Sequence, residues 1–265
     1  MIPNSLHIWG PFGIHLFGLM AGLALLVSGW ISGLELERKG HSADFAWTMV
    51  GWAAVCGFGG AKLWAVLQDP RALFIDPIGQ VFSGSGFVWY GGLLGGTLGV
   101  SYAIRRHRLP WLMVVDCVAP ALAIGQAIGR VGCQLAGDGD WGKVSDVPWA
   151  MTYPYAIVGW PFPEGVRVHP TPVYEMIAYV AVFAVLWSMR KRPHADGTIF
   201  CWYLVMAPAA RFVVEFWRIN PTVALGLSAA QLFSLLLMAI GACGLLAQRG
   251  RAPAPRSRAA SAAPQ

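Results

Sequence analysis

Residues 14–34 read IHLFGLMAGLALLVSGWISGL, a run that contains no Asp, Glu, Lys or Arg. A helix of that length rises about 30 Å, which is the thickness of the hydrocarbon core of a bilayer. An uncharged apolar run of this kind predicts a membrane-spanning helix rather than a helix of a soluble core.

The rest of the chain repeats this pattern. Six further apolar stretches of similar length follow, at roughly 45–67, 87–104, 112–131, 172–189, 198–217 and 227–247. We therefore predict an all-α polytopic membrane protein with about seven transmembrane helices, in which residues 1–248 form a single transmembrane domain.

The composition agrees with a membrane protein. Of the 265 residues, 56% are hydrophobic and only 12% are charged, which is half the share of about 25% in soluble domains. The five cysteines are scattered without CxxC spacing, so neither a disulfide framework nor a cysteine metal site is predicted. The net charge of +6 comes from short basic clusters between apolar spans, which is a pattern of membrane topology and indicates no nucleic-acid partner.

The basic clusters also predict the orientation of the chain. Twelve of the 19 Lys and Arg residues lie in one alternate set of connections and in residues 249–265, whereas the opposite connections hold four. By the positive-inside rule the N-terminus lies outside and the C-terminus in the cytoplasm. The long connection 132–171 is then a periplasmic loop or cap, and residues 249–265 form a disordered basic cytoplasmic tail.

Charged residues occur inside the predicted spans, where each costs at least about 2.5–3.5 kcal/mol at the bilayer centre. Arg211 and Glu215 are spaced i, i+4, and Arg218 at i+7 would continue the same helical face. This arrangement is either a structural ion pair near the outer interface or an anion site. In an anion site Arg211 would bind the anion, and Glu215 would orient Arg211 or handle a proton.

A second candidate lies at the end of the span 112–131. Arg130 lies in a run with five glycines, GRVGCQLAGDGDWG at residues 129–142, which would let a phosphate approach the backbone and a planar guanidinium. The alternative is an interfacial arginine beside a plain flexible loop. Asp138 and Asp140 lack further oxygen ligands, so no metal site is predicted. Cys133 is expected to be the most exposed of the five thiols.

Other polar residues cluster toward the same outer side. His169, just before the fifth span, and Tyr174, in its first turn, could simply anchor the interface, whereas Glu175 lies one turn inside that span. The run WYGGLLGG at 89–96 is either a small-residue packing face or a thin wall beside a cavity into which Tyr90 points. His15 and Asp116 are read as buried and structural. Together these residues predict a polar pocket for a lipid that carries a phosphate.

These motifs, in their order along the chain, carry a family resemblance. GRVG at 129–132, HPTPVYE at 169–175, YGGLLG at 90–95 and RFVVEFWR at 211–218 resemble the prolipoprotein diacylglyceryl transferases. The resemblance implies transfer of the diacylglyceryl group of phosphatidylglycerol to the lipobox cysteine of a bacterial prolipoprotein, the first step of lipoprotein maturation. It also implies a location in the cell inner membrane, among membrane lipids, and no metal or organic cofactor.

The resemblance also implies roles for individual residues. The catalytic candidates are Arg211, Glu215, Tyr90 and His15. The substrate-binding candidates are Arg130, Cys133, Asp138, Gly142, Lys62, His169, Tyr174 and Glu175. The chain departs from the usual family pattern by substitutions at Phe17, Lys62, Tyr90, Cys133 and Ala136 and by the insertion of Gly139. These departures leave two alternatives open: a related membrane transferase with another acceptor, and a non-enzymatic lipid-binding or transport protein.

Overall fold

The computed structural model describes residues 5–9, 12–69 and 88–250. Its helices are α1 (Leu16–Arg38), α2 (Asp44–Gln68), α5 (Trp89–Arg106), α6 (Trp111–Ala136), α7 (Thr171–Met189), α8 (Thr198–Val214), the 3-10 helix η1 (Glu215–Trp217) and α9 (Ala229–Gln248). Each predicted span coincides with one helix. Residue 87 of the predicted span 87–104 lies outside the described residues, as does most of the predicted tail, residues 251–265.

Six of these helices are long and apolar enough to cross a membrane by length and composition. They are α1, α2, α6, α7, α9 and the segment from Thr198 to Trp217. The prediction of an α-helical polytopic membrane protein is confirmed at this level. Helix α5 does not reach the same hydropathy, because its 18 residues include five glycines and end in Arg105 and Arg106.

Two short hairpins were not predicted from the sequence. Strand β1 (Ser5–Trp9) pairs with β2 (Phe12–His15), and β3 (Thr222–Ala224) pairs with β4 (Leu227–Ser228), both antiparallel. Leu225 and Gly226 form the second turn with φ of 54° and 72°, the two positive values that a tight type I′ hairpin requires. These hairpins connect to helix ends and leave the α-helical class unchanged.

Contacts divide the chain into two compact units, each described separately. The smaller unit comprises the described part of residues 29–114, and the larger one the described parts of residues 1–28 and 115–256. In the smaller unit the glycines of α5 lie against α2. A Cβ atom added at Gly99 would lie 2.8 Å from the Cys56 Cβ, and one at Gly95 would lie 3.1 Å from the Gly60 Cα. The run at 89–96 is therefore a small-residue packing face, as one of the two interpretations predicted.

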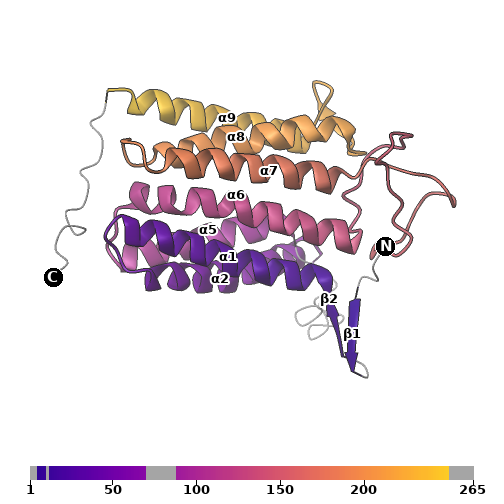
Figure 1. Ribbon diagram of the computed structural model, residues 1–265, viewed down its shortest axis with the longest axis horizontal. Coiled ribbons are helices and arrows are strands. Elements are labelled where there is room, and N and C mark those ends of the chain that lie inside the picture. Colours follow the sequence, from indigo (N-terminus) through magenta and orange to yellow (C-terminus); the bar gives the residue numbers. More distant parts are fainter. Residues whose placement is uncertain (1–4, 10–11, 70–87, 251–265) are drawn as a thin grey trace. The chain divides into compact units, whose positions relative to one another are not determined.

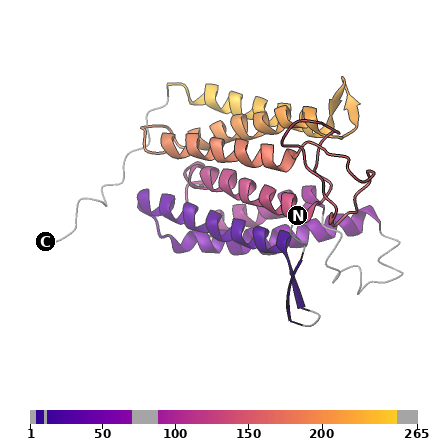
Figure 2. The same cartoon turned by 45° about the vertical axis from the view of Figure 1, so that its right-hand side comes forward.

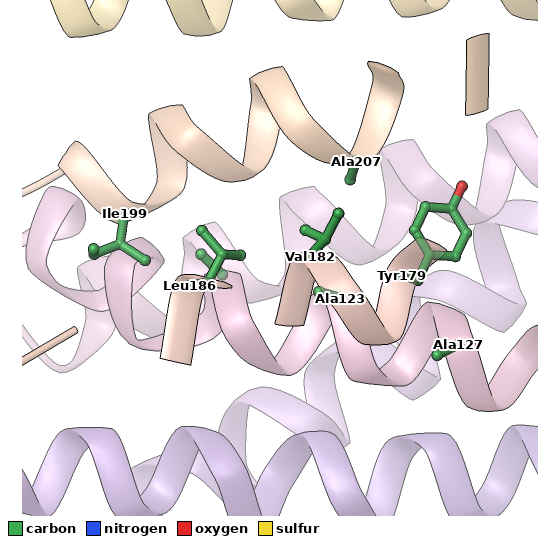
Figure 3. Packing of buried hydrophobic residues seen from close by; sticks show 8 residues of the cluster. Ala123, Ala127, Tyr179, Val182, Leu186, Ile199 and Ala207 are labelled. Atoms are coloured by element: carbon green, nitrogen blue, oxygen red, sulfur yellow. The ribbon is translucent and has the colours of Figure 1, made fainter. Parts of the chain in front are cut away.

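In the larger unit α6, α7, α8 and α9 lie side by side (Figures 1 and 2). An apolar cluster joins three of these helices at their middle (Figure 3). Its buried residues are Ala119, Ala123 and Ala127 from α6, Tyr179, Val182 and Leu186 from α7, and Ile199 and Ala207 from α8. The alanines recur every fourth residue, which places them on one face of α6 and lets the neighbouring helices approach closely.

A buried carboxylate fixes the start of α8. Asp116 accepts hydrogen bonds from the backbone amides of Gly197 (2.8 Å) and Phe200 (2.9 Å), two of the groups that have no partner within the first turn of a helix. The structural interpretation of Asp116 is therefore confirmed. Figure 1 shows that α6 and α8 end, and α7 and α9 begin, at the same end of this bundle.

The connection between α6 and α7 is folded and shorter than predicted. Helix α6 continues to Ala136, so residues 132–136 are helical and the connection spans 137–170. Trp141, Tyr153 and Val168 are buried in it, with Trp160 and Phe162 packed against them. Backbone bridges join Val144 and Met151 to Val168. The predicted boundary was wrong because Gly132 lies inside the helix, where it packs against Phe17 and Met20 of α1 and this packing overrides its low helix propensity.

Candidate functional site

A network of three guanidinium groups and three carboxylates lies at the end of the bundle where α6 and α8 end. Helices α6, α7, α8 and η1 contribute, and so do the folded connection and the segment after η1. The members are Arg130 of α6, Glu175 of α7, Arg211 of α8, Glu215 of η1, Asp140 of the connection and Arg218. Sequence analysis selected four of them, and the structure brings those four together with Asp140 and Arg218.

Glu175 is the centre of the network. Its Oε2 atom pairs with Nε of Arg130, and its Oε1 atom pairs with Nη1 of Arg211. The side chain is 0% exposed. A carboxylate this deeply buried is tolerated only where cations compensate it, so Glu175 fixes the spacing of two arginines that are 81 residues apart in sequence.

Glu215 holds Arg211 from the other side. Its Oε2 atom lies 2.9 Å from Nη2 of Arg211. Its Oε1 atom accepts hydrogen bonds from the Ser228 hydroxyl (2.7 Å) and the Asn220 amide (2.6 Å). Ser228 is also the N-cap of α9, so the orientation of Arg211 is tied to the start of that helix.

Asp140 bridges two arginines with its two oxygens. Oδ2 pairs with Nη1 of Arg130 and Oδ1 with Nη2 of Arg218. The expectation that Arg218 continues the helical face at i+7 was wrong, because α8 ends at Val214 and Arg218 has an extended backbone (φ −82°, ψ 162°). Arg218 is only 7% exposed, and its Nε and Nη1 atoms have no hydrogen-bond partner among the described residues.

The charges around Asp140 keep its carboxyl ionised. Burial by itself would raise its pKa, but the hydrogen bond from Arg218 and the charges of Arg130, Arg218 and Arg211 outweigh burial and bring the pKa to about 2. The carboxylate is therefore negative throughout the physiological pH range.

This arrangement suits a phosphate better than a metal ion. The ligand atoms of Cys133, Asp138 and Asp140 lie within 4.8 Å of one another. Both oxygens of Asp140 already face guanidinium groups, however, and Arg130 Nη1 lies 3.6 Å from Cys133 Sγ, so cations occupy the positions next to this cluster. Guanidinium groups held as planar forks in a partly dry site bind phosphate oxygens in pairs.

The chain matches the family described as prolipoprotein diacylglyceryl transferase over residues 3–247. The chain belongs to this family. Three relatives each carry the name phosphatidylglycerol–prolipoprotein diacylglyceryl transferase. The relative from Nitratidesulfovibrio vulgaris is 34% identical over 94% of this chain and 95% of that protein. The one from Chromohalobacter salexigens is 34% identical over 79% and 76%, and the one from Clostridium tetani is 29% identical over 91% and 95%.

Cys133 is a candidate substrate-binding residue from the family resemblance. The prediction that its thiol is the most exposed of the five was wrong. Cys133 is buried at 9% exposure, whereas Cys243 is the exposed thiol. The cause is again the continuation of α6 to Ala136, since Cys133 then lies on a packed helix instead of a loop. Asp138 follows the helix end, and its carboxylate accepts the Asp140 amide (3.2 Å).

His169, Tyr174 and Gly142, three further candidates from the family resemblance, lie beside the network. The Tyr174 hydroxyl lies 2.9 Å from His169 Nδ1 and accepts a hydrogen bond from the Trp149 indole (2.7 Å). The buried Gly142 donates its amide to the His169 carbonyl (2.8 Å). A Cβ atom at Gly142 would lie 2.9 Å from the Cβ of His169 and from Cγ2 of Thr171, so glycine alone fits there.

The remaining candidates are His15, Tyr90 and Lys62. His15 ends β2 directly before α1 and is exposed, which contradicts its interpretation as a buried residue. Tyr90, half exposed at the start of α5, and Lys62 of α2 belong to the smaller unit. Arg218 and Asp140 are the members that the list of candidates lacked. The spacing of Arg218 from Arg211 was visible in the sequence. The pairing of Arg218 with Asp140 was not, because the two residues are 78 positions apart.

Proposed function

We propose that this protein transfers the diacylglyceryl group of phosphatidylglycerol to the lipobox cysteine of bacterial prolipoproteins, the first step of lipoprotein maturation. The cysteine thiol loses its proton to a base, and the sulfur attacks the glycerol carbon that bears the phosphate. A C–S bond forms, the C–O bond breaks, and the electron pair leaves on the phosphate oxygen as glycerol phosphate. The observation that carries the proposal is the gathering of Arg130, Arg211 and Arg218 at one bundle end in a chain of this family.

In this reaction Arg130 and Arg211 bind the phosphate and stabilise the charge that develops on the leaving oxygen. Such stabilisation by fixed donors is worth several kcal/mol in a site with little water. Glu175 and Glu215 hold the two guanidinium groups. Because both oxygens of Glu215 already face donors, the geometry favours an orienting role for Glu215 over proton transfer.

The base is assigned to Tyr90 or His15. A histidine is the better base near neutral pH, because its reference pKa is about 6.5 against about 10 for tyrosine. Substitution of each residue by Phe distinguishes the two candidates. The variant that lacks the true base should lose most of its transfer rate, and the other variant should keep it. A loss in neither variant would exclude both.

The membrane topology belongs to the same proposal. We place α5 as a seventh span, the N-terminus outside the cell inner membrane, the connection 137–170 in the periplasm and the C-terminus in the cytoplasm. In the larger unit Arg192 and Arg249 follow the ends of α7 and α9, opposite the ionic network. The Arg190 guanidinium lies 3.4 Å from the centroid of the Trp187 ring, which is typical of an interfacial anchor.

Reporter fusions test this topology. A fusion at Lys143 should give a periplasmic signal and a fusion at Arg251 a cytoplasmic one. The reason is that twelve of the 19 basic residues lie in the connections and the tail on the proposed cytoplasmic side. The same signal from both fusions would eliminate the model with seven spans.

The function is tested with purified protein in phosphatidylglycerol vesicles. A signal peptide with a lipobox cysteine should gain the mass of one diacylglyceryl group, and its Cys→Ser counterpart should gain none. Complementation of a strain depleted of its own transferase gives the second readout. Transfer to a different thiol or hydroxyl, without transfer to the lipobox peptide, would favour the related-transferase alternative suggested by Cys133, Ala136 and Gly139. Lipid binding without any transfer would favour a non-enzymatic lipid-binding or transport protein.

A further inference from the structure

The ionic network is electrically balanced. Its three guanidinium groups carry three positive charges, and the three carboxylates paired with them carry three negative ones. The Asp138 carboxylate lies within 4.8 Å of the Asp140 carboxylate, outside these ion pairs, and adds no positive charge. An incoming phosphodiester with one negative charge would therefore meet a site without net charge, and the attraction that brings anions into a cationic site would be absent. Binding of a phosphate requires one carboxylate to leave.

Only one of the three carboxylates is placed to leave. The side chains of Glu175 and Glu215 are 0% and 1% exposed and belong to helical segments. The Asp140 side chain is 27% exposed and belongs to the connection, directly after Gly139. Gly137 and Gly139 have φ of 61° and 94°, a region that glycine enters without strain and that permits rearrangement of this segment.

Asp140 also has the geometry of a bound phosphate. Its two oxygens each contact a guanidinium of a different arginine, Arg130 and Arg218, as two oxygens of one phosphate group would. Arg218 is buried, and its Nε and Nη1 donors make no hydrogen bond among the described residues; they lie 3.6 Å from Glu215 Oε2 and 4.0 Å from Glu175 Oε1. A phosphate, which has more acceptor oxygens than a carboxylate, could use a donor that Asp140 leaves unsatisfied.

We propose that the Asp140 carboxylate occupies the phosphate position of the lipid-free protein and is displaced by the phosphate of the donor lipid. This inference rests on the proposed function. With Asp140 displaced, the remaining ion-paired groups, three arginines and two glutamates, carry one net positive charge, which matches one phosphodiester. The leaving glycerol phosphate carries a second negative charge above a pKa of about 6, and the returning Asp140 carboxylate repels it, which promotes its release. Asp140 is thus a positioning residue that also drives turnover.

The test measures the affinity of glycerol phosphate for the purified full-length protein by calorimetry, in nanodiscs of phosphatidylcholine alone. The variants are Asp140→Asn and Asp140→Ser, with Asp140→Glu as the charge-retaining control and the exposed Asp146→Asn as the matched control in the same connection. Loss of the competing charge should tighten binding about tenfold, which corresponds to about 1.4 kcal/mol. Asp146→Asn should stay within about twofold of the unchanged protein, and Asp140→Glu, which keeps the competing charge, should not tighten binding.

Steady-state kinetics with phosphatidylglycerol give an independent measure of how the intact donor lipid binds and reacts. Asp140→Asn should lower KM for phosphatidylglycerol and lower kcat, because the lipid binds better and the product leaves more slowly. If Asp140 only supported the structure of the site, Asp140→Asn would instead raise KM and weaken binding of glycerol phosphate. Unchanged or weaker binding in both Asp140→Asn and Asp140→Ser overturns the inference.

A measurement on the unchanged protein covers the case in which these variants do not fold. Carboxyl labelling with a water-soluble carbodiimide, mapped by mass spectrometry, should increase at Asp140 when glycerol phosphate is added and stay constant at Asp146. Protection of Asp140 would overturn the inference. Thioether formation after phosphatidylglycerol and a lipobox peptide are supplied to the same protein tests the proposed function separately, since its absence would leave the binding and labelling results intact.

Discussion

Helices α6, α7 and α8 contact one another in two regions, one near their middle and one at their end. The two regions differ in the kind of side chain that makes the contact. At the middle, Ala123, Val182 and Ala207 fill space with apolar atoms, and many side chains of similar volume would serve. At the end, Glu175 and Arg211 meet as buried charges, and each needs its specific partner. The first region provides cohesion of the bundle, whereas the second carries an energetic cost that we attribute to the proposed function.

The largest effect on the transfer rate is expected from substitutions of the arginines at the charged end of the bundle. Arg130→Lys and Arg211→Lys keep the charge but lose the planar fork that binds two oxygens at once. We expect each variant to lower kcat/KM for diacylglyceryl transfer by about 100-fold or more, in line with the loss of a preorganised donor. Initial rates with a lipobox peptide measure this effect. The exposed Arg192→Lys is the control and should keep its rate; near-normal rates in both site variants would refute the phosphate assignment.

A paired experiment sharpens the comparison between the two regions. Glu175→Gln leaves two guanidinium groups without their shared counter-charge, which typically costs about 3–5 kcal/mol, and should reduce both thermal stability and transfer rate. Leu186→Ala in the apolar cluster should reduce stability through a cavity, by about 2–5 kcal/mol as in soluble cores, but leave KM unchanged. Thermal unfolding in nanodiscs and steady-state kinetics separate the two. An unchanged transfer rate in Glu175→Gln would show that the network is structural.

A smaller effect is expected at the edge of the charged end. In Gly142→Ala the new methyl group would press on His169 and Thr171, and the shift would reach Asp140, whose carbonyl accepts the Thr171 hydroxyl. We expect a loss of about 1–3 kcal/mol, as for overpacking elsewhere, and a raised KM. Gly165→Ala provides a control in the same connection, because no atom lies within 4 Å of its added Cβ, although its positive φ adds a small strain.

The smallest effect is expected at Cys133. The substrate brings its own nucleophilic thiol, so Cys133→Ser should keep a sizeable fraction of the activity, and no lipid-linked form of the protein should accumulate. Intact-mass spectrometry after incubation with phosphatidylglycerol alone checks this. A gain of one diacylglyceryl group that disappears in Cys133→Ser would indicate a two-step mechanism through an enzyme thioether.

Helices were predictable from this sequence because apolar runs of about 20 residues have few alternatives in structure. Arg130, Glu175 and Arg211 were recognisable for a related reason, since a charge in such a run is costly wherever it lies. Neither argument needs knowledge of which segments become neighbours.

Asp140, Arg218 and Cys133 show where this kind of prediction ends. Asp140 lies in a polar connection where a carboxylate carries no signal, and its role comes from partners in α6 and beyond η1. Arg218 was placed by helical periodicity, which fails because α8 ends at Val214. Cys133 was placed on the surface because nearby glycines suggested a loop, whereas packing keeps the helix intact to Ala136.

The network also sets an order for the biosynthesis of the protein. Arg130 leaves the ribosome 45 residues before Glu175 and 81 residues before Arg211, so α6 enters the membrane before its buried counter-charge in α7 is made, with only the partly exposed Asp140 close behind it in sequence. The pairing of Arg130 with Glu175 joins α6 to α7, and this pair carries no net charge until Arg211 arrives. The insertion machinery must therefore keep three consecutive helices within reach of one another until α8 is complete.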